Sequence, residues 1–219
     1  MIKDRLETLS SSLPSVVKLV AVSKFHPESA IIEAYNAGQR IFAESRPQEF
    51  QRKVLALKES CPELEWHFIG HLQTNKLKMV LPYARLVQSI DSLHLMQAVN
   101  DWGVREGRRI NVLVELHIGA EESKSGFSPQ DAASLLSQDW QGLRICGLMG
   151  MATNTDDAGI IASDFARIKG VFDRLRSDFP DNKDFTELSI GMSHDWKIAL
   201  DYGATMVRIG TAIFGEREY

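Results

Sequence analysis

A short run of apolar residues recurs eight times along the 219-residue chain, and each run is followed by a stretch with helical periodicity or a short helical turn. The first run begins at Lys18 and the last at Thr205, so successive runs start about 27 residues apart, which is room for a strand and a helix. The runs do not alternate with polar residues, which is typical of parallel strands covered by helices. We expect strands at Lys18–Val22, Arg40–Ala43, Glu65–Phe68, Leu86–Ser89, Ile110–Leu116, Leu143–Gly147, Phe185–Leu188 and Thr205–Ile209.

Helix start signals fall between these runs. Pro27 suits a first helical position, Ser92 and Ser128 suit N-caps, and Pro129 follows the second of these caps. A further helix is expected over Ile2–Leu13, before the first strand. The other expected helices are Pro27–Ala37, Gln48–Glu59, Asn75–Leu81, Ser92–Gly103, Ser128–Ser137, Asp156–Arg176 and Asp195–Tyr202.

Two architectures fit parallel strands that alternate with helices: an open doubly wound sheet and a closed eight-stranded barrel. Eight units favour the barrel. The turn after the first strand reads VSKFHP, without the glycine-rich fingerprint of a dinucleotide-binding sheet. No linker or change of composition divides the chain. We therefore expect the α/β class, with a single (β/α)8 TIM barrel over residues 1–219.

Composition and charge exclude several classes of protein. The chain has 25 basic and 29 acidic side chains, a net charge of −4, so no overall positive field attracts nucleic acid or anionic lipid. The charged N-terminus is unlike a signal peptide, and no apolar run reaches the ~18 residues of a membrane span. Cys61 and Cys146 lie far apart, without a CxxC pair or a histidine cluster. We expect a cytoplasmic protein without structural zinc or a disulfide framework.

The residues that directly follow each strand are the ones to inspect, because the active sites of parallel βα barrels lie at the carboxyl ends of the strands. Lys24 follows the buried run KLVAV. Desolvation there would lower the pKa of its ammonium group and free the amine as a nucleophile, which suits a Schiff-base lysine. The alternative is a strand-end lysine whose ammonium group reaches solvent.

The last two strand ends suggest an anion site. Gly191 and Ser193 follow one strand, Gly210 and Thr211 follow the other, and each pair precedes a helical segment. Glycine backbone, hydroxyl groups and helix starts at this place bind phosphate in many barrels. The alternative is that the glycines only form turns and that Thr211 caps a helix. Together with Lys24, the pattern favours a phosphorylated carbonyl compound, either an aldolase substrate or pyridoxal phosphate.

Other histidine and serine patterns are weaker. Ser193, His194 and Asp195 are contiguous, and three neighbours on one loop do not easily form a serine–histidine–carboxylate relay. His67 and His71 straddle a strand end rather than a helix face, so a packed His67 is favoured over zinc ligation. The four tryptophans form no stripe and are interpreted as packing residues.

Six segments together resemble the pyridoxal phosphate homeostasis protein family over nearly the whole chain. Members look like the barrel domain of bacterial alanine racemases standing alone, without the β-domain that those enzymes carry. The longest segment matches the family residue after residue in the same order, so its match is specific. AVSK alone would be no evidence for the family. The segments are AVSK at 21–24, WHFIGHLQTNK at 66–76, QSIDS at 88–92, ESKSGF at 122–127, GLMGM at 147–151 and LSIGMSHDWKIALDYGATMVRIGTAIFG at 188–215.

The resemblance implies a role for each matching site residue. Lys24 would form the Schiff base with the cofactor aldehyde, and Arg208 would face the pyridine nitrogen. Ser193, Gly210 and Thr211 would hold the phosphate. Asn75 would lie near the cofactor rim or a transfer surface. The family commonly reads Phe-Gly-Glu-Asn where this chain has Phe42-Ala43-Glu44-Ser45, so Ser45 replaces a longer asparagine beside the cofactor.

The implied function is a non-catalytic binder that buffers pyridoxal phosphate and supplies it to apo-enzymes, as a monomer or a dimer. A positive Arg208 would keep the ring nitrogen unprotonated and weaken the cofactor as an electron sink. The alternatives are an amino-acid racemase and a class I aldolase. A racemase needs a second base, whereas Tyr35, Tyr83 and Tyr202 are expected on the helical layer and Tyr219 ends the given sequence soon after the last unit.

Overall fold

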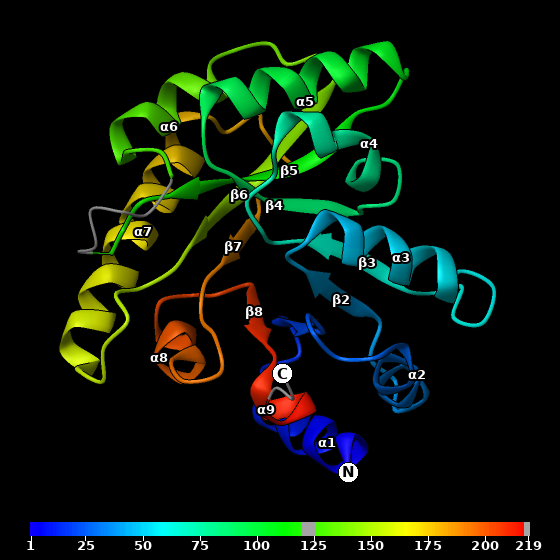
Figure 1. Ribbon diagram of the computed structural model, residues 1–219. Coiled ribbons are helices and arrows are strands. Elements are labelled where there is room, and N and C mark those ends of the chain that lie inside the picture. The colour runs from blue at the N-terminus through cyan, green and yellow to red at the C-terminus, as the bar shows by residue number, and fades with distance from the viewer. Residues whose placement is uncertain (120–125, 217–219) are drawn as a thin grey trace.

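Eight parallel strands close into a barrel in the computed structural model, which describes residues 1–119 and 126–216 (Figure 1). Each strand pairs with the next along the chain, and the last pairs with the first between Lys18–Ala21 and Met206–Ile209. The closed barrel predicted from the repeat is confirmed. The strands are β1 (Lys18–Val22), β2 (Ile41–Glu44), β3 (Glu65–Phe68), β4 (Leu86–Ile90), β5 (Ile110–Leu116), β6 (Leu143–Gly150), β7 (Glu187–Ser189) and β8 (Met206–Ile209).

The helices form an outer layer around the barrel (Figure 1). The additional N-terminal helix lies beside the last one, where the Arg5 side chain donates a hydrogen bond to the Ile213 carbonyl at 3.3 Å. The helical elements are α1 (Ile2–Ser12), α2 (Glu28–Asn36), α3 (Pro47–Leu57), η1 (Thr74–Lys76), α4 (Leu77–Val80), α5 (Leu93–Arg105), α6 (Pro129–Leu136), α7 (Ala158–Asp178), α8 (Trp196–Asp201) and α9 (Thr211–Phe214).

Most helix start signals act as expected. Ser92 caps α5 by accepting a hydrogen bond from the Leu95 N–H, and Ser128 caps α6 with Pro129 as the first helical residue. The prediction for Pro27 is wrong, because this proline is the N-cap residue of α2, with an extended ψ of 162°. Proline fixes φ but not ψ, so it fits either position.

Strand β6 runs to Gly150, beyond its expected end at Gly147. A Cβ atom at Gly147 would lie only 1.8 Å from the Glu187 carbonyl oxygen, and its φ is +155°. This glycine therefore allows β6 and β7 to approach closely instead of ending the strand. As a result Met149, expected in a loop, belongs to the barrel wall.

The apolar core has two parts. Inside the barrel lies a small cluster that includes Val20, Leu113 and Met206. The larger part fills the space between strands and helices and contains Trp66, Trp102, Trp140 and Trp196, so the prediction that the tryptophans pack is confirmed. In the part of the chain that the structure describes, no helix is long and apolar enough to span a membrane.

The barrel interior also contains a line of buried polar side chains. The Ser189 hydroxyl donates to Gln88 Oε1 at 2.7 Å, and Gln88 Nε2 lies 2.8 Å from His67 Nδ1. Burial lowers the pKa of His67 to about 3, so its ring is neutral at physiological pH and accepts the amide hydrogen bond. The expected packed role of His67 is confirmed.

Candidate functional site

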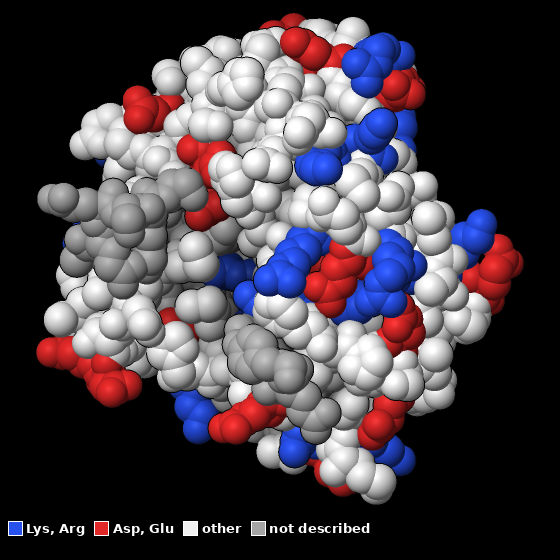
Figure 2. Space-filling model, viewed as in Figure 1, with Lys and Arg blue, Asp and Glu red and all other residues white. Residues whose placement is uncertain are grey.

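A cavity of about 270 Å³ opens at the carboxyl ends of the strands and appears as a hollow near the centre of the face shown in Figure 2. This volume is near the lower end of the ~300–1,000 Å³ typical of small-molecule pockets. Five of the seven predicted site residues line it, together with a mainly apolar wall. The described lining residues are Val22, Lys24, His26, Ile69, Met149, Met151, Met192, Ser193, His194, Arg208, Gly210 and Thr211.

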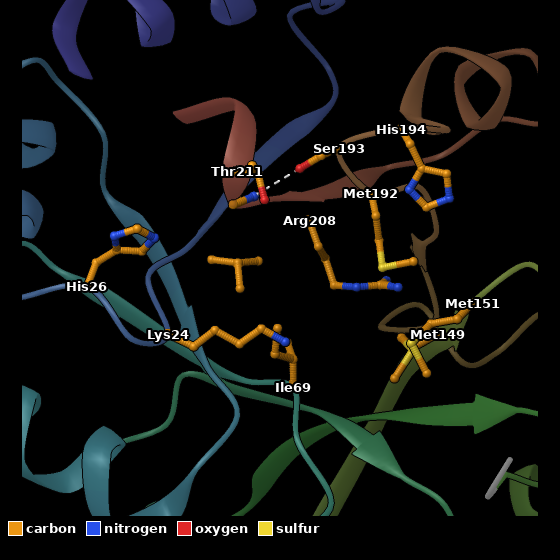
Figure 3. A pocket seen from close by; sticks show the side chains of 12 residues that line it. Lys24, His26, Ile69, Met149, Met151, Met192, Ser193, His194, Arg208 and Thr211 are labelled. Carbon is orange, nitrogen blue, oxygen red and sulfur yellow. Dashed lines mark hydrogen bonds between the residues drawn. The ribbon is translucent and has the colours of Figure 1, made fainter. Parts of the chain in front are cut away.

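Lys24 lies in the tight turn that follows β1. The backbone continues the pairing of β1 with β2 through Ser23, whose N–H donates to the Ala43 carbonyl at 3.0 Å. It then turns at Phe25, which has a left-handed φ of 69°. Figure 3 shows that the Lys24 side chain extends across the cavity toward Ile69. Its amine is thus placed inside the pocket, although the side chain is only partly buried.

Arg208 of β8 forms the opposite wall and is 4% exposed. Its Nη1 donates to the carbonyl and hydroxyl oxygens of Ser189 at 2.8 and 2.7 Å, and Nη2 donates to the Gly150 carbonyl at 3.0 Å. Burial lowers the pKa of Arg208 to about 10, against the opposing effect of Glu115 and Asp195. The guanidinium group therefore stays charged at neutral pH and is held rigidly by neutral oxygen atoms.

Ser193, Gly210 and Thr211 meet at one edge of the cavity. The Gly210 N–H donates to Ser193 Oγ at 3.4 Å, drawn as a dashed line in Figure 3. This hydrogen bond is long and therefore weak, so the Gly210 N–H and the Ser193 hydroxyl can both exchange it for a stronger hydrogen bond to a ligand. Gly210 is the N-cap residue of α9 and Thr211 is the first helical residue, so the alternative that Thr211 caps the helix is wrong.

The two helices next to this edge are short. α8 has six residues and α9 has four, so their dipoles add little attraction for an anion. Binding of an anion there depends instead on the local N–H and hydroxyl groups. The loop that carries Ser193 is closed by Asp195, a buried side chain that accepts a hydrogen bond from the Met192 N–H.

Two histidines line the cavity although the sequence did not single them out as ligand-binding residues. The His26 ring stacks on Phe214 with centroids 5.0 Å apart. His194 Nε2 lies 3.4 Å from Asp195 Oδ2, beyond good hydrogen-bond distance. The position of both residues just after a strand was the signal that could have identified them.

Three methionines build the apolar wall beside Arg208 (Figure 3). Met149 and Met151 are two residues apart at the end of β6, and Met192 comes from the loop after β7. The spacing of two places Met149 and Met151 on the same face of the chain as it leaves the strand. That spacing could have been read from GLMGM once the strand was continued through Gly147.

The structure does not bring Ser45 and Asn75 into this cavity. Asn75 is exposed in η1 and lines a separate hollow against α5, with Lys78 and Trp102. The Ser45 carbonyl oxygen lies 1.9 Å from where a Cβ atom of Gly70 would be, so its backbone is pressed against the end of β3. A direct contact of either residue with a ligand in the cavity stays a prediction.

Part of the resembling segments lies outside the described residues, namely Glu122 to Ser125 of ESKSGF, as does Tyr219. Among the described lining residues none is a tyrosine. Tyr35, Tyr83 and Tyr202 pack partly buried against the core between barrel and helices, as expected.

Comparisons with known proteins cover almost the whole chain. A family model described as alanine racemase, N-terminal domain, matches residues 1–218. The pyridoxal phosphate homeostasis protein of Pasteurella multocida is 39% identical over 94% of this chain and 88% of its own length. The human protein of that name is 38% identical over 94% of this chain and 79% of its own length.

Solved structures give the same grouping. PipY of Synechococcus elongatus without PLP has a TM-score of 0.92 and 37% identity, covering 98% of this chain and all of its own. The same protein solved with PLP bound has a TM-score of 0.91. Alanine racemase of Corynebacterium glutamicum, at 15% identity and a TM-score of 0.74, shares the fold over 60% of its chain. The chain therefore belongs to the alanine racemase N-terminal domain family and, within it, to the pyridoxal phosphate homeostasis proteins.

Proposed function

We propose that this protein binds pyridoxal 5'-phosphate in the cavity at the carboxyl ends of the strands, buffers it and supplies it to apo-enzymes. The observation that carries the proposal is the convergence of one amine, one buried guanidinium group and a hydroxyl-lined glycine edge in a single cavity. When bound, pyridoxal phosphate supplies an aldehyde that forms a C=N bond with a primary amine and releases one water. The relatives named for this role support the proposal.

The residues present fit this cofactor. Lys24 provides the only lysine amine among the described lining residues, and Ser193, Gly210 and Thr211 provide donors for a phosphate. A Cβ atom at Gly210 would lie 3.1 Å from the Val22 carbonyl oxygen, so glycine lets the end of β8 lie close to β1 at this edge. Arg208 would face the pyridine nitrogen, and the methionines would pack against the ring. An aldolase substrate would not need this apolar wall.

We propose that the protein is not an amino-acid racemase. Racemisation needs a base on each face of the substrate, and the described lining residues include no tyrosine to act opposite Lys24. The positive charge of Arg208 disfavours protonation of the ring nitrogen and so weakens the stabilisation of a carbanion. A racemase also tolerates an arginine at this nitrogen, so the second base is what distinguishes the two functions. An open mouth also admits water, which weakens electrostatic stabilisation further.

The proposal extends to the setting in which the protein acts. Residues 1–219 would form a single domain in the cytoplasm and act as a monomer or a dimer. Its partners would be pyridoxal phosphate and the apo-enzymes that receive it, with no nucleic acid or membrane partner. The cavity opens to the surface as a hollow in Figure 2, which supports a route for the cofactor to enter and leave.

Three measurements on the purified protein test this function. The loaded protein should activate an apo form of a pyridoxal-phosphate enzyme, while the α-proton of L-alanine exchanges only slowly in deuterated water and no D-alanine forms. Cofactor at about 100 times its Kd should stabilise the fold by roughly 2.7 kcal/mol, a shift of about 5–10 °C in Tm. Turnover of L-alanine near ~10 per second, or the absence of any Tm shift, would contradict the proposal.

A further inference from the structure

A fully buried lysine lies behind the cavity, on the side of α3 that faces the barrel. Lys53 is 0% exposed, although lysine is among the residue types least often buried. Its ammonium group donates to the Ser23 carbonyl at 2.8 Å, to Glu44 Oε1 at 2.7 Å and to Glu49 Oε1 at 2.8 Å. These three hydrogen bonds use all the protons of the ammonium group. Lys53 therefore joins the ends of β1 and β2 to α3.

The two peptide groups that flank Lys24 are both bonded to this cluster. The carbonyl of Ser23 belongs to the peptide before Lys24 and accepts from Lys53. The N–H of Phe25 belongs to the peptide after Lys24 and donates to Glu49 Oε1 at 2.8 Å. Because φ and ψ are the rotations between two adjoining rigid peptide planes, anchoring both planes fixes the backbone of Lys24 and the direction of its side chain.

Several features of this cluster do not favour the stability of the folded protein. Phe25 has a left-handed φ of 69°, which is unfavourable for a residue with a Cβ atom. Burial raises the pKa of Glu44 despite Lys53, and Glu44 Oε2 is buried without a hydrogen-bond partner among the described residues. A buried ion pair commonly adds no stability over apolar packing, and backbone strain collects at functional sites. Here all these features surround one residue, Lys24.

Glu49 completes the arrangement as a charged acceptor. Partial burial acts to raise its pKa, but hydrogen bonds from Lys53 and the Phe25 N–H hold the pKa of Glu49 below its ordinary value. The far side of the turn is packed as well, since the Arg46 guanidinium group lies 4.5 Å from the centre of the Phe25 ring. The turn is thus held from both sides.

We propose that Lys53 and Glu49 are positioning residues that hold the Lys24 amine in the orientation needed to react with the cofactor aldehyde. This inference rests on the proposed function of Lys24. Neither residue lines the cavity, and both act through the backbone on either side of Lys24.

The main test compares Glu49→Ala with Glu49→Gln, because the Glu49 side chain is 15% exposed and its loss should leave the protein folded. The readout is the rate at which pyridoxal phosphate forms an adduct at Lys24, trapped with borohydride and located by peptide mass spectrometry. Glu49→Ala should slow this rate about tenfold, as expected for one charge-assisted hydrogen bond. Glu49→Gln keeps an acceptor oxygen and should recover most of the rate. Glu59→Ala, at an exposed glutamate beyond α3, is the matched control and should react as wild type.

Hydrogen exchange of the Phe25 amide provides a readout that needs no cofactor. In Glu49→Ala this amide should exchange at least ~10-fold faster than in wild type, whereas Glu49→Gln should keep most of the protection. Lys53→Met should produce both effects, with Lys58→Met, at an exposed lysine, as its control. Tm measurements ensure that rates are compared on folded protein.

The outcomes separate the two proposals. A wild-type protein that forms no adduct at Lys24 would contradict the proposed function. Adduct formation that is as fast in folded Glu49→Ala as in wild type would overturn the positioning role while leaving the proposed function in place. Equal loss in Glu49→Ala and Glu49→Gln would also overturn it, because the acceptor oxygen would then not be what matters.

Discussion

Both ends of the barrel open into hollows that contain charged side chains, but these charges are arranged differently. The hollow at the amino ends of the strands is larger, about 450 Å³ against about 270 Å³ at the carboxyl ends. Its basic residues are paired with carboxylates: Lys18 with Glu187, Arg85 with Glu65 at 4.0 Å, and Arg144 with Asp184 at 3.2 Å. Burial also raises the pKa of Cys146 in this hollow to about 11, so its thiol stays protonated at neutral pH.

At the carboxyl ends, three hydrogen bonds of Arg208 go to neutral oxygen atoms instead. The carboxylates of Glu115 and Asp195 act on the Arg208 charge but accept none of these three hydrogen bonds, so the guanidinium group can also act on a ligand. The comparison shows that neither volume nor the number of charged residues identifies a site. What distinguishes the carboxyl end is that its cation, its amine and its backbone donors face one space. We expect the carboxyl end to control ligand binding and the amino end to affect stability.

The largest expected effect comes from Lys24→Ala. This variant should lose the visible absorbance of the lysine adduct completely, because no other lysine lies among the described lining residues. It should stay folded, since Lys24 is in a turn at the mouth and outside the apolar core. An absorption spectrum taken after unbound cofactor has been removed by dialysis checks this. Retention of the adduct band would mean that another lysine carries the cofactor or that the assignment is wrong.

Thr211→Ala should weaken pyridoxal phosphate binding about tenfold or somewhat more. Loss of a charge-assisted hydrogen bond to the phosphate costs ~1.5–3 kcal/mol, whereas pyridoxal, which lacks the phosphate, should bind the variant and the wild type equally. Titrations of both proteins with both vitamers measure this. If the wild type bound pyridoxal phosphate and pyridoxal with equal affinity, the phosphate would not be bound at this edge.

The polar line inside the barrel predicts a pH dependence of stability. An unfolded histidine titrates near pH 6.5, whereas the pKa of folded His67 is about 3, so between these values only the unfolded chain takes up the proton. The contribution of His67 to the free energy of unfolding is full above pH 6.5. It should fall on acidification toward pH 3 by up to ~1.4 kcal/mol per pH unit.

His67→Gln lacks this titration. Urea unfolding at several pH values should therefore show the stability difference between wild type and His67→Gln narrowing as the pH falls. A constant difference between pH 7 and pH 4 would mean that His67 is not buried in its neutral form.

The smallest effect is expected from Lys18→Met at the amino end. The Lys18 side chain is 47% exposed, so its pair with Glu187 contributes at most ~1 kcal/mol after solvent screening. Pyridoxal phosphate affinity should not change at all. A tenfold loss of affinity in this variant would show that the two ends of the barrel are not functionally separate.

The closed barrel and five of the seven predicted site residues could be identified from the sequence. Both depend on patterns among residues that are close together in the chain. The bounds of β1, β3 and β5 match the predictions, since each is a short run rich in aliphatic or aromatic residues. Lys24 and Thr211 were identified by their places directly after strands, which the topology of a parallel barrel brings to one rim.

The buried cluster of Lys53, Glu49 and Glu44 next to Lys24 could not be predicted in this way. Glu49 and Lys53 are spaced i, i+4 on a helix, which normally indicates an exposed surface pair. Their burial depends on how α3 packs behind the ends of β1 and β2, and this is a tertiary contact without a local signature. Met149 was misassigned for a related reason, because Gly147 lies within a strand only where Glu187 comes close.

The most direct test of this account is to locate the lysine that reacts with pyridoxal phosphate. Wild-type protein is incubated with the cofactor, reduced with borohydride, digested and mapped by mass spectrometry. The proposed function predicts one stoichiometric modification at Lys24, at the carboxyl end of the barrel. Modification at Lys18, at the opposite end, or scattered substoichiometric labelling of exposed lysines with Lys24 unmodified, would contradict it.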